Sequence, residues 1–306
     1  MTTEKMIDLF SLAGTALNAL GTQYESALRQ TNAELGLEGQ DWNLLFSVQG
    51  VEPAPITAAL LQQFAPYITL EKLEQQLADA AGRGLLQADA TGSYRLTDHG
   101  RQAVHQSFGA VHAALADVEP LPAGDMDRLN RLLRRLVDAA LAAPAPAEKP
   151  ELHASRLTDP GARGSAAALT DQYLTDLVRF RDDAHQAAWQ PHGIGGPTWE
   201  ALTLIWRGAA YSPESLSKLL EHRAQPPQVY IDAIHTLVER GWIAQHGEAY
   251  HVIDRGAALR QQAEEATDRF FYAPWSCLSG DETDELRGLL IQLRDRYAPA
   301  SLETTG

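Results

Sequence analysis

The side chains best suited to hold a small ligand lie in two short segments that are far apart in the sequence. Residues 179–185 place Arg181 and His185 four positions apart, on one face of a helix. Residues 264–268 place a glutamate, a threonine and an aspartate on one face in the same way. An arginine there would hold an anionic group of a ligand, and His185 would titrate near neutral pH. With tryptophans as apolar walls, the predicted ligand-binding residues are Arg179, Arg181, His185, Trp189, Glu264, Thr267, Asp268 and Trp275.

Two other interpretations of these residues stay open. The charges can form a salt-bridge network that only fixes two helices, with the tryptophans in the core. A histidine with carboxylates also binds divalent metals, but the spacing matches no metal motif, so we predict no metal.

The sequence has no Gly-x-Ser-x-Gly, no His-Glu-x-x-His and no phosphate-binding loop. We therefore predict no catalytic residue and no cofactor, and the sequence favours a protein that is not an enzyme without deciding the question.

The segment that carries these residues belongs to the second copy of an internal repeat. Residues 42–100 return as residues 199–256: Trp-x-x-Leu and Arg-Gly recur at a shift of 157 residues, and Tyr-x-x-x-Asp-x-Gly recurs at a shift of 156. Such a repeat is a supersecondary unit used twice. The first copy has Phe108, Val111 and His112 at the positions of the carboxylate face. The polar cluster is therefore present in one copy only, which favours a single asymmetric site.

Each copy has the pattern of helices followed by a two-stranded ribbon and further helices. This is the order of a winged helix-turn-helix module, in which the helix before the ribbon is the candidate DNA reader. The fold class is therefore mainly α with small β-ribbons. The expected helices are 6–35, 42–48, 56–65, 69–81, 101–116, one from 124, 169–188, 198–207, 213–222, 227–240, 256–272 and 282–297, and the expected ribbons are 85–96 and 242–252.

The domain boundaries follow from the same pattern. Residues 142–165 are rich in alanine, proline and glycine and show no periodicity, so we expect a linker there. The first winged-helix module is expected in 1–141 and the second in 166–300, each with flanking helices that pair the modules. The chain of 306 residues suffices for two such domains.

Composition limits the partners. The formal net charge is −15 and the pI is about 5.0, which opposes binding to polyanions at long range but leaves local basic patches open. One cysteine, Cys277, excludes an internal disulfide. No apolar run is long enough to span a membrane and no signal peptide begins the chain, so we expect a cytoplasmic protein without a membrane partner.

The pattern Leu77…Arg83-Gly84-Leu85-Leu86…Tyr94-Arg95-Leu96-Thr97-x-x-Gly100 resembles the MarR family of winged-helix regulators. The resemblance implies double-stranded DNA as a partner and homodimers with interlocked terminal helices. It also implies a pocket for a small apolar or anionic ligand between those helices and the reading heads. With both copies in one chain, the expectation is a monomer acting as a pseudo-dimer. The second half is similar to a bacterial family of duplicated MarR-like proteins, described as SalK-like, at Arg179–His185, Glu264-x-x-Thr267-Asp268-Arg269 and Pro274-Trp275.

The candidate reading helices are poor in cations, which DNA phosphates require. The predicted DNA-binding residues are Lys72, Gln75, Gln76, Arg95, Gln228 and His235. Lys72 stands among acidic residues, and neither wing has the Asp-x-Arg element that MarR wings usually carry. Two hypotheses follow: a ligand-responsive, DNA-binding transcription regulator, or a small-molecule binding protein or enzyme that has kept the scaffold and lost DNA binding.

Overall fold

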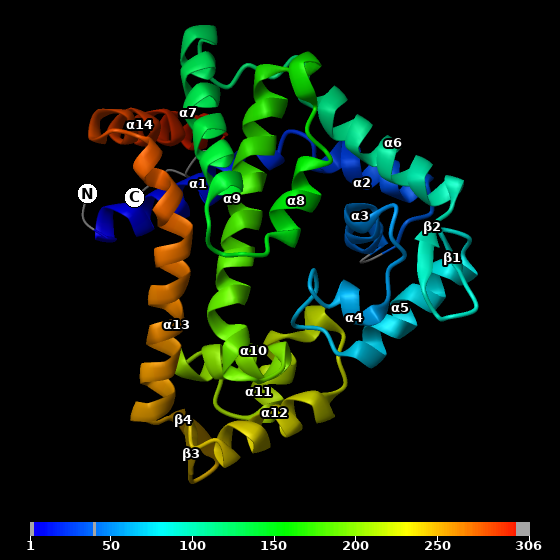
Figure 1. Cartoon of the computed structure of the whole chain (residues 1–306), viewed down its shortest axis with the longest axis vertical. Helices are drawn as coiled ribbons and strands as arrows, with labels where there is room; N and C mark the ends of the chain where they lie inside the picture. The colour runs from blue at the N-terminus through cyan, green and yellow to red at the C-terminus, as the bar shows by residue number, and fades with distance from the viewer. Residues whose placement is uncertain (1–2, 39–40, 298–306) are drawn as a thin grey trace, which may run out of the picture.

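The computed structural model describes residues 3–38 and 41–297, and these are mainly helical with two short antiparallel ribbons (Figure 1). The first half contains α1 (Thr3–Gly21), α2 (Glu25–Glu34), α3 (Asp41–Val51), α4 (Ala58–Leu61), α5 (Leu70–Gly82), β1 (Leu86–Ala88), β2 (Tyr94–Leu96), α6 (Asp98–Ala114) and α7 (Ala123–Ala142). The second contains α8 (Pro150–Arg156), η1 (Gly161–Arg163), α9 (Ala166–Trp189), η2 (Gln190–His192), α10 (Gly196–Trp206), α11 (Pro213–Leu219), η3 (Glu221–Arg223), α12 (Pro227–Glu239), β3 (Ile243–His246), β4 (Ala249–Val252), α13 (Asp254–Tyr272), η4 (Ala273–Cys277) and α14 (Gly280–Tyr297).

The ribbons and the helices after them form as the sequence predicts. Leu86 pairs with Leu96, and Ile243 pairs with Val252. The Thr97 side chain accepts a hydrogen bond from the Gly100 amide and so caps α6. A Cβ atom on Gly100 would lie 2.2 Å from the Leu85 carbonyl oxygen, so only glycine lets the strand approach the helix so closely. Gly256 meets the Trp242 carbonyl in the same way, at 2.1 Å.

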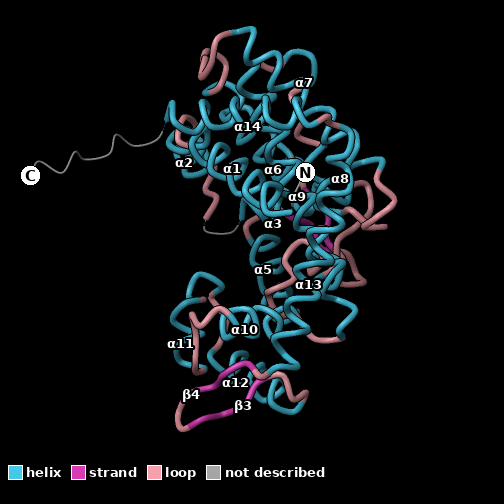
Figure 2. Tube along the Cα trace, turned by 90° about the vertical axis from the view of Figure 1, so that its left-hand side faces the viewer, coloured by secondary structure: helices cyan, strands magenta, loops and turns pink. Residues whose placement is uncertain are grey.

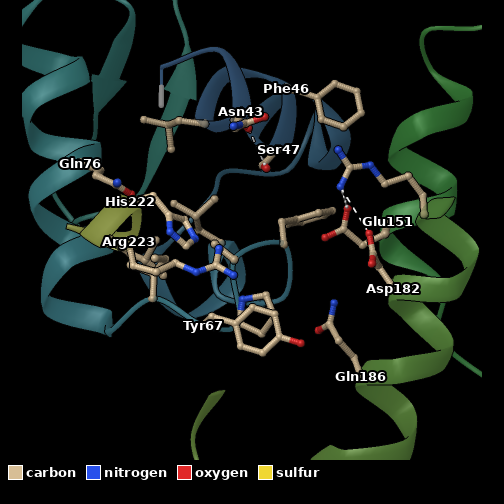
Figure 3. Close-up of a pocket in the computed structure, with 18 of the residues that line it drawn as sticks. Asn43, Phe46, Ser47, Tyr67, Gln76, Glu151, Asp182, Gln186, His222 and Arg223 are labelled. Carbon is tan, nitrogen blue, oxygen red and sulfur yellow. Dashed lines mark hydrogen bonds and ion pairs between the residues drawn. The ribbon is translucent and has the colours of Figure 1, made fainter. Parts of the chain in front are cut away.

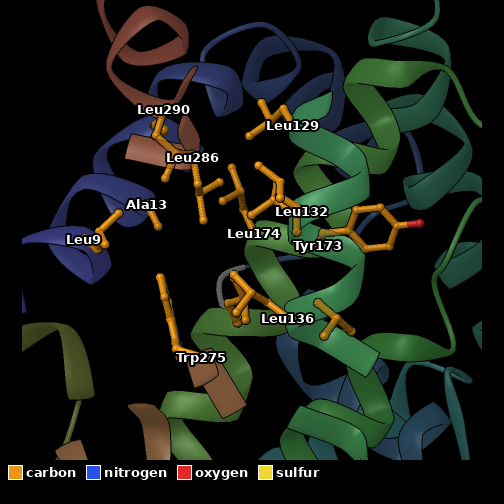
Figure 4. Close-up of a cluster of buried hydrophobic side chains, with 14 of the residues drawn as sticks. Leu9, Ala13, Leu129, Leu132, Leu136, Tyr173, Leu174, Trp275, Leu286 and Leu290 are labelled. Carbon is orange, nitrogen blue, oxygen red and sulfur yellow. The ribbon is translucent and has the colours of Figure 1, made fainter. Parts of the chain in front are cut away.

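The main apolar core lies between helices that are distant in sequence (Figure 4). α1 packs on α14, and α7 packs on α9. Leu9, Leu136, Leu174 and Leu290 are fully buried or nearly so in this cluster. The segment from α3 to β2, which we call the first head, has a smaller core of its own around Leu45 and Leu77. The segment from α10 to β4, which we call the second head, has one around Trp199 and Ile234. Ribbon β3/β4 lies at the far end of the molecule from α7 and α14 (Figure 2).

Three local expectations were wrong. The helix expected over 6–35 is two helices, because the chain turns at 22–24, where the Thr22 hydroxyl donates to the Ala19 carbonyl. Tyr24 and Leu28 then pack around Leu115. The helix expected over 56–65 is the single turn of α4. Leu70, expected on one helix face with Leu73 and Leu77, is exposed, whereas those two are buried.

The segment 142–165 contains a helix that its composition does not predict. Within α8, Leu152 and Ala154 are fully buried, and the helix packs along α9. The Asp183 carboxylate accepts the backbone amides of Glu151 and Leu152, both at 3.0 Å, and so caps α8 from a neighbouring helix. The stabilising partner comes from outside the segment, so local periodicity carries no sign of it. The division into 1–141 and 166–300 stays a prediction, and residues 298–300 lie outside the described part.

Candidate functional site

The two predicted polar faces meet where α9 crosses α13. Arg181 Nη1 lies 3.0 Å from Asp268 Oδ1, and Arg181 Nη2 lies 4.0 Å from Glu264 Oε2. The same guanidinium lies over the Phe10 ring, 4.6 Å from its centroid. The cations of one helix therefore face the carboxylates of the other as expected, but each already has a partner within the protein.

His185 is held in a fixed hydrogen-bonded chain. The Trp199 indole N–H donates to His185 Nε2 at 3.2 Å, so the neutral ring carries its proton on Nδ1, 3.3 Å from Thr267 Oγ1. The Thr267 hydroxyl in turn donates to the Ala263 carbonyl at 2.8 Å. Burial, and secondarily the positive charge of Arg260, lower the pKa of His185 to about 4. The expectation that His185 titrates near neutral pH is therefore wrong.

Arg260 completes this cluster, and the sequence analysis does not identify it. Its side chain is almost fully buried, with the guanidinium 5.1 Å from the Trp199 ring centroid and 5.2 Å from that of Trp206. It pairs with Glu264, and its Nε donates to Thr203 Oγ1 at 3.0 Å. The available signal was an arginine four residues before Glu264, the spacing at which opposite charges pair along a helix.

The other predicted residues separate. Trp189 stacks on Trp199 with ring centroids 5.8 Å apart, and Trp275 packs with Phe271 in the main core. Neither lines the two cavities described below, and neither do Arg181, Glu264, Thr267 or Asp268. Arg179 and His185 do line a cavity, so of the predicted ligand-binding residues these two lie where a ligand could contact them.

A cavity of about 450 Å³ lies between α3, α4 and α5 of the first head, α8 and α9, and η3 of the second head (Figure 3). We call it the central cavity. Glu151, Asp182 and Gln186 lie on one side of it, His222 and Arg223 lie on the other, and the Tyr67 hydroxyl points towards Gln186. Apolar side chains of the first head, such as Phe46 and Phe64, complete the wall.

Two carboxyl groups on the acidic side of the central cavity, those of Glu151 and Asp182, have raised pKa values. Arg179 Nη1 lies 3.5 Å from Glu151 Oε2 and 3.5 Å from Asp182 Oδ2. Burial nevertheless raises the pKa of Glu151 to about 8, against the effect of Arg179, and also raises the pKa of Asp182. At neutral pH the Glu151 carboxyl therefore carries a proton, which makes it a hydrogen-bond donor inside the cavity.

The opposite side is held by contacts between the two heads. Arg223 lies over the Tyr67 ring at 5.1 Å and pairs with Glu200 at 2.8 Å. Gln225 donates to the Tyr67 carbonyl at 2.7 Å. Gly196 packs on the Pro66 carbonyl so closely that a Cβ atom would lie 1.8 Å from that oxygen. These contacts hold one head against the other beside the cavity.

The predicted DNA-binding residues do not form a basic surface. Gln75 donates to Asp79 and Gln228 donates to Asp232, both within their own helices and at 2.8 Å or less. Arg95 is bound to the Pro53 carbonyl. His235 is exposed, Lys72 is partly buried beside the exposed Glu71, and Gln76 lines the central cavity.

The comparisons with known proteins identify a family. Residues 106–303, more than half of the chain, match a helix-turn-helix family. The chain belongs to this helix-turn-helix family. At a coarse level, such a family indicates a DNA-binding regulator. The matched part begins within α6, so it includes α12 but not α5. No curated protein and no solved structure matches the chain.

The described residues contain no group of three or more histidine, cysteine or carboxylate side chains arranged to hold a metal ion. None of their helices is both long enough and apolar enough to cross a membrane.

Proposed function

We propose that this helix-turn-helix protein binds a small molecule in its central cavity. The observation that carries the proposal is the convergence of charged and polar side chains from both heads and from α9 around about 450 Å³ of space. Cavities of this size, with a few oriented polar groups on apolar walls, are typical of ligand sites. Arg179 and a protonated Glu151 offer donors, whereas Asp182 and Gln186 offer acceptors.

We also propose that the chain is a MarR-like pseudo-dimer made by duplication of one module. The order of elements from α3 to α7 recurs from α10 to α14, which supports a duplication. The packing of α1 on α14 and of α7 on α9 supports an exchange of terminal helices between modules. In such an arrangement the central cavity lies at the interface between the two modules, so a ligand would contact both modules.

The test is retention of a small molecule by the purified protein. We expect native mass spectrometry to show a retained compound, or a panel of drug-sized compounds to raise the melting temperature. A ligand at 100 times its Kd stabilises the fold by about 2.7 kcal/mol. Gln76→Trp should abolish either effect, because residue 76 lines the cavity from α5. Gln75→Trp is the matched control, since Gln75 is exposed on the same helix. Equal ligand retention by both variants would contradict the proposal.

A ligand-responsive DNA-binding regulator is the second candidate, and the family match favours it. Two observations weigh against it for the form described here. The reading helices carry Glu71, Glu74, Asp232 and Glu239, which repel phosphates. The two heads are also in contact, whereas paired reading helices in adjacent grooves stand about 34 Å apart. As a regulator, the protein would have to separate its heads when the ligand leaves or binds.

A further inference from the structure

A second cavity, of about 210 Å³, lies between the first head and α9. Three aromatic rings line one part of it: the Trp42 and Phe108 rings lie 4.6 Å apart and the Phe46 and Phe108 rings 5.8 Å apart, all three partly exposed. Polar side chains, among them Ser155 and Gln172, line much of the rest. We call it the aromatic cavity. It meets the central cavity at Asn43, Phe46 and Arg179, which line both.

One carboxylate lines the aromatic cavity among the described residues, and it is Asp171 of α9. Its Oδ1 atom is buried and has no hydrogen-bond partner within the described part of the chain. Burial raises the pKa of Asp171 to about 7, and the neighbouring Tyr24 hydroxyl opposes this rise. A buried carboxylate oxygen without a partner is costly, so a donor brought by a ligand would stabilise it.

The internal repeat gives the residues of the second copy that correspond to those around the aromatic cavity. At the shifts given above, Trp42 corresponds to Trp199, Val104 to Arg260 and Phe108 to Glu264. In the second copy the Arg260 guanidinium lies on the Trp199 ring and pairs with Glu264. In the first copy both charged residues are replaced by apolar ones: Phe108 lines the aromatic cavity beside Trp42, and Val104 is buried in the core around Leu45 and Leu77. In the second copy, therefore, a cation lies against Trp199, the tryptophan that corresponds to Trp42.

The other titratable groups at the aromatic cavity do not compete for this role. His112 faces it from α6, and burial lowers its pKa, which favours the neutral ring. Arg179 is engaged by Glu151 and Asp182 on the side of the central cavity. The Tyr24 hydroxyl is uncharged, because burial raises its pKa. Asp171 is left as the group that can balance a positive charge.

We propose that the aromatic cavity is a second binding site, specific for a protonated amine carried on an aromatic or apolar body. The ammonium group lies at Asp171, and the body packs against Trp42, Phe46 and Phe108. Ring faces and a buried carboxylate together favour a cation over a neutral or anionic molecule of the same shape. The proposal goes beyond ligand binding in the central cavity and does not depend on it.

The test compares three compounds with the same phenylethyl body by isothermal titration with the full chain: 2-phenylethylamine, the neutral alcohol 2-phenylethanol and the anion 3-phenylpropionate. We expect the amine to bind at least about tenfold more tightly than the alcohol, and the anion not to bind. Asp171→Asn should remove the preference for the amine while binding of the alcohol stays unchanged. Asp117→Asn is the control, because Asp117 is exposed after α6 and lines neither cavity.

Val111→Phe, which fills the aromatic cavity from α6, should abolish binding of all three compounds. Thermal melts of each variant show whether the fold is retained, and Tyr24→Phe gives a milder change at the same carboxylate. Failure of the amine to saturate the wild-type protein, equal affinity for amine and alcohol, or a preference that survives in Asp171→Asn would each overturn the proposal. Because Gln76→Trp acts on the central cavity alone, the two sites can fail independently.

Discussion

The side-chain oxygen of Gln225 accepts a hydrogen bond from the backbone amide of Thr69 at 3.0 Å. Thr69 is the residue before α5, and Gln225 stands two residues before α12 begins. The N-termini of the two predicted reading helices are therefore joined by one side chain. In helix-turn-helix proteins these N-termini carry the residues that contact base edges. The contact thus holds the two helix starts close to each other.

The first prediction concerns this contact. Gln225→Ala should destabilise the fold by about 1 kcal/mol, the usual net value of hydrogen bonds of this kind. The Thr69 amide should also exchange its hydrogen faster, because it loses its acceptor. Hydrogen exchange followed by NMR measures this amide directly. Gln228→Ala is the control, since Gln228 bonds only to Asp232 within α12. Unchanged exchange at Thr69 would show that the heads are not held by this contact in solution.

The second prediction concerns Arg260. Arg260→Val should lower the free energy of unfolding by about 3 kcal/mol, because it removes a buried ion pair and two ring contacts. Adding Glu264→Phe reproduces the apolar pair of the first copy, Val104 and Phe108, and should recover part of the loss. Urea denaturation of the two single variants and the double variant gives the coupling energy.

Arg255→Val is the control for Arg260, since Arg255 is exposed in the first turn of α13. An exposed substitution of this kind changes stability by no more than about 0.5 kcal/mol. Additive effects of Arg260→Val and Glu264→Phe would mean that the pair does not act as a unit in the second head.

The fold could be read from the sequence where the cause is local. The ribbons, their flanking helices and glycines such as Gly100 follow from turn residues and apolar periodicity within a short window. The two polar faces around Arg181 and Asp268 were also paired correctly, because the resemblance to MarR-like dimers implies that α9 and α13 border one pocket.

The rest depends on partners that are distant in sequence. α8 is capped by Asp183, about thirty residues later, so its own alanine- and proline-rich composition resembles a linker. His185 was expected to titrate near neutral pH, but burial, and secondarily Arg260 of α13, lower its pKa. Trp199 of α10 fixes its tautomer. The central cavity depends on the docking of one head on the other, which no periodicity encodes.

The third prediction follows from the protonation of Glu151. Its pKa is raised from 4.5 to about 8 in the folded protein, so the folded state binds the proton more tightly than the unfolded state does. Stability contributed by this group therefore falls as pH rises from about 4.5 to about 8, by at most about 1.4 kcal/mol per pH unit. Glu151→Gln should flatten the dependence and make the variant relatively more stable above pH 8.

Urea denaturation between pH 5 and pH 9 measures that slope. A residual fall is expected in Glu151→Gln, because burial also raises the pKa of Asp183 and of Asp171 to about 7. The exposed Glu148→Gln is the control for loss of one nearby carboxylate. If Glu151→Gln keeps the wild-type slope, the carboxyl is not protonated in the folded state.

The fourth prediction concerns the state of His185. We expect its neutral ring, protonated on Nδ1, to persist below pH 5, because burial and Arg260 disfavour the imidazolium. The folded-state pKa is depressed, so this contribution to stability is present above about pH 6.5 and is lost as pH falls towards 4. Long-range ¹H–¹⁵N NMR spectra report both the tautomer and the titration. A midpoint near 6.5, or a proton on Nε2, would contradict the hydrogen-bonded chain from Trp199 to Thr267.

The fifth prediction separates the two candidate functions. In a mobility-shift titration at low salt, the wild-type chain should not bind duplex DNA specifically, because α12 carries Asp232 and Glu239 and the chain as a whole carries a charge of −15. If α12 nevertheless reads DNA, Asp232→Asn with Glu239→Gln should raise affinity strongly. Asp281→Asn with Asp284→Asn makes the same change of charge on α14, away from the heads, and is the matched control. A specific shift by the wild-type chain that strengthens only with the α12 variants would favour the regulator, whereas equal behaviour of both double variants would leave α12 without a role in DNA binding.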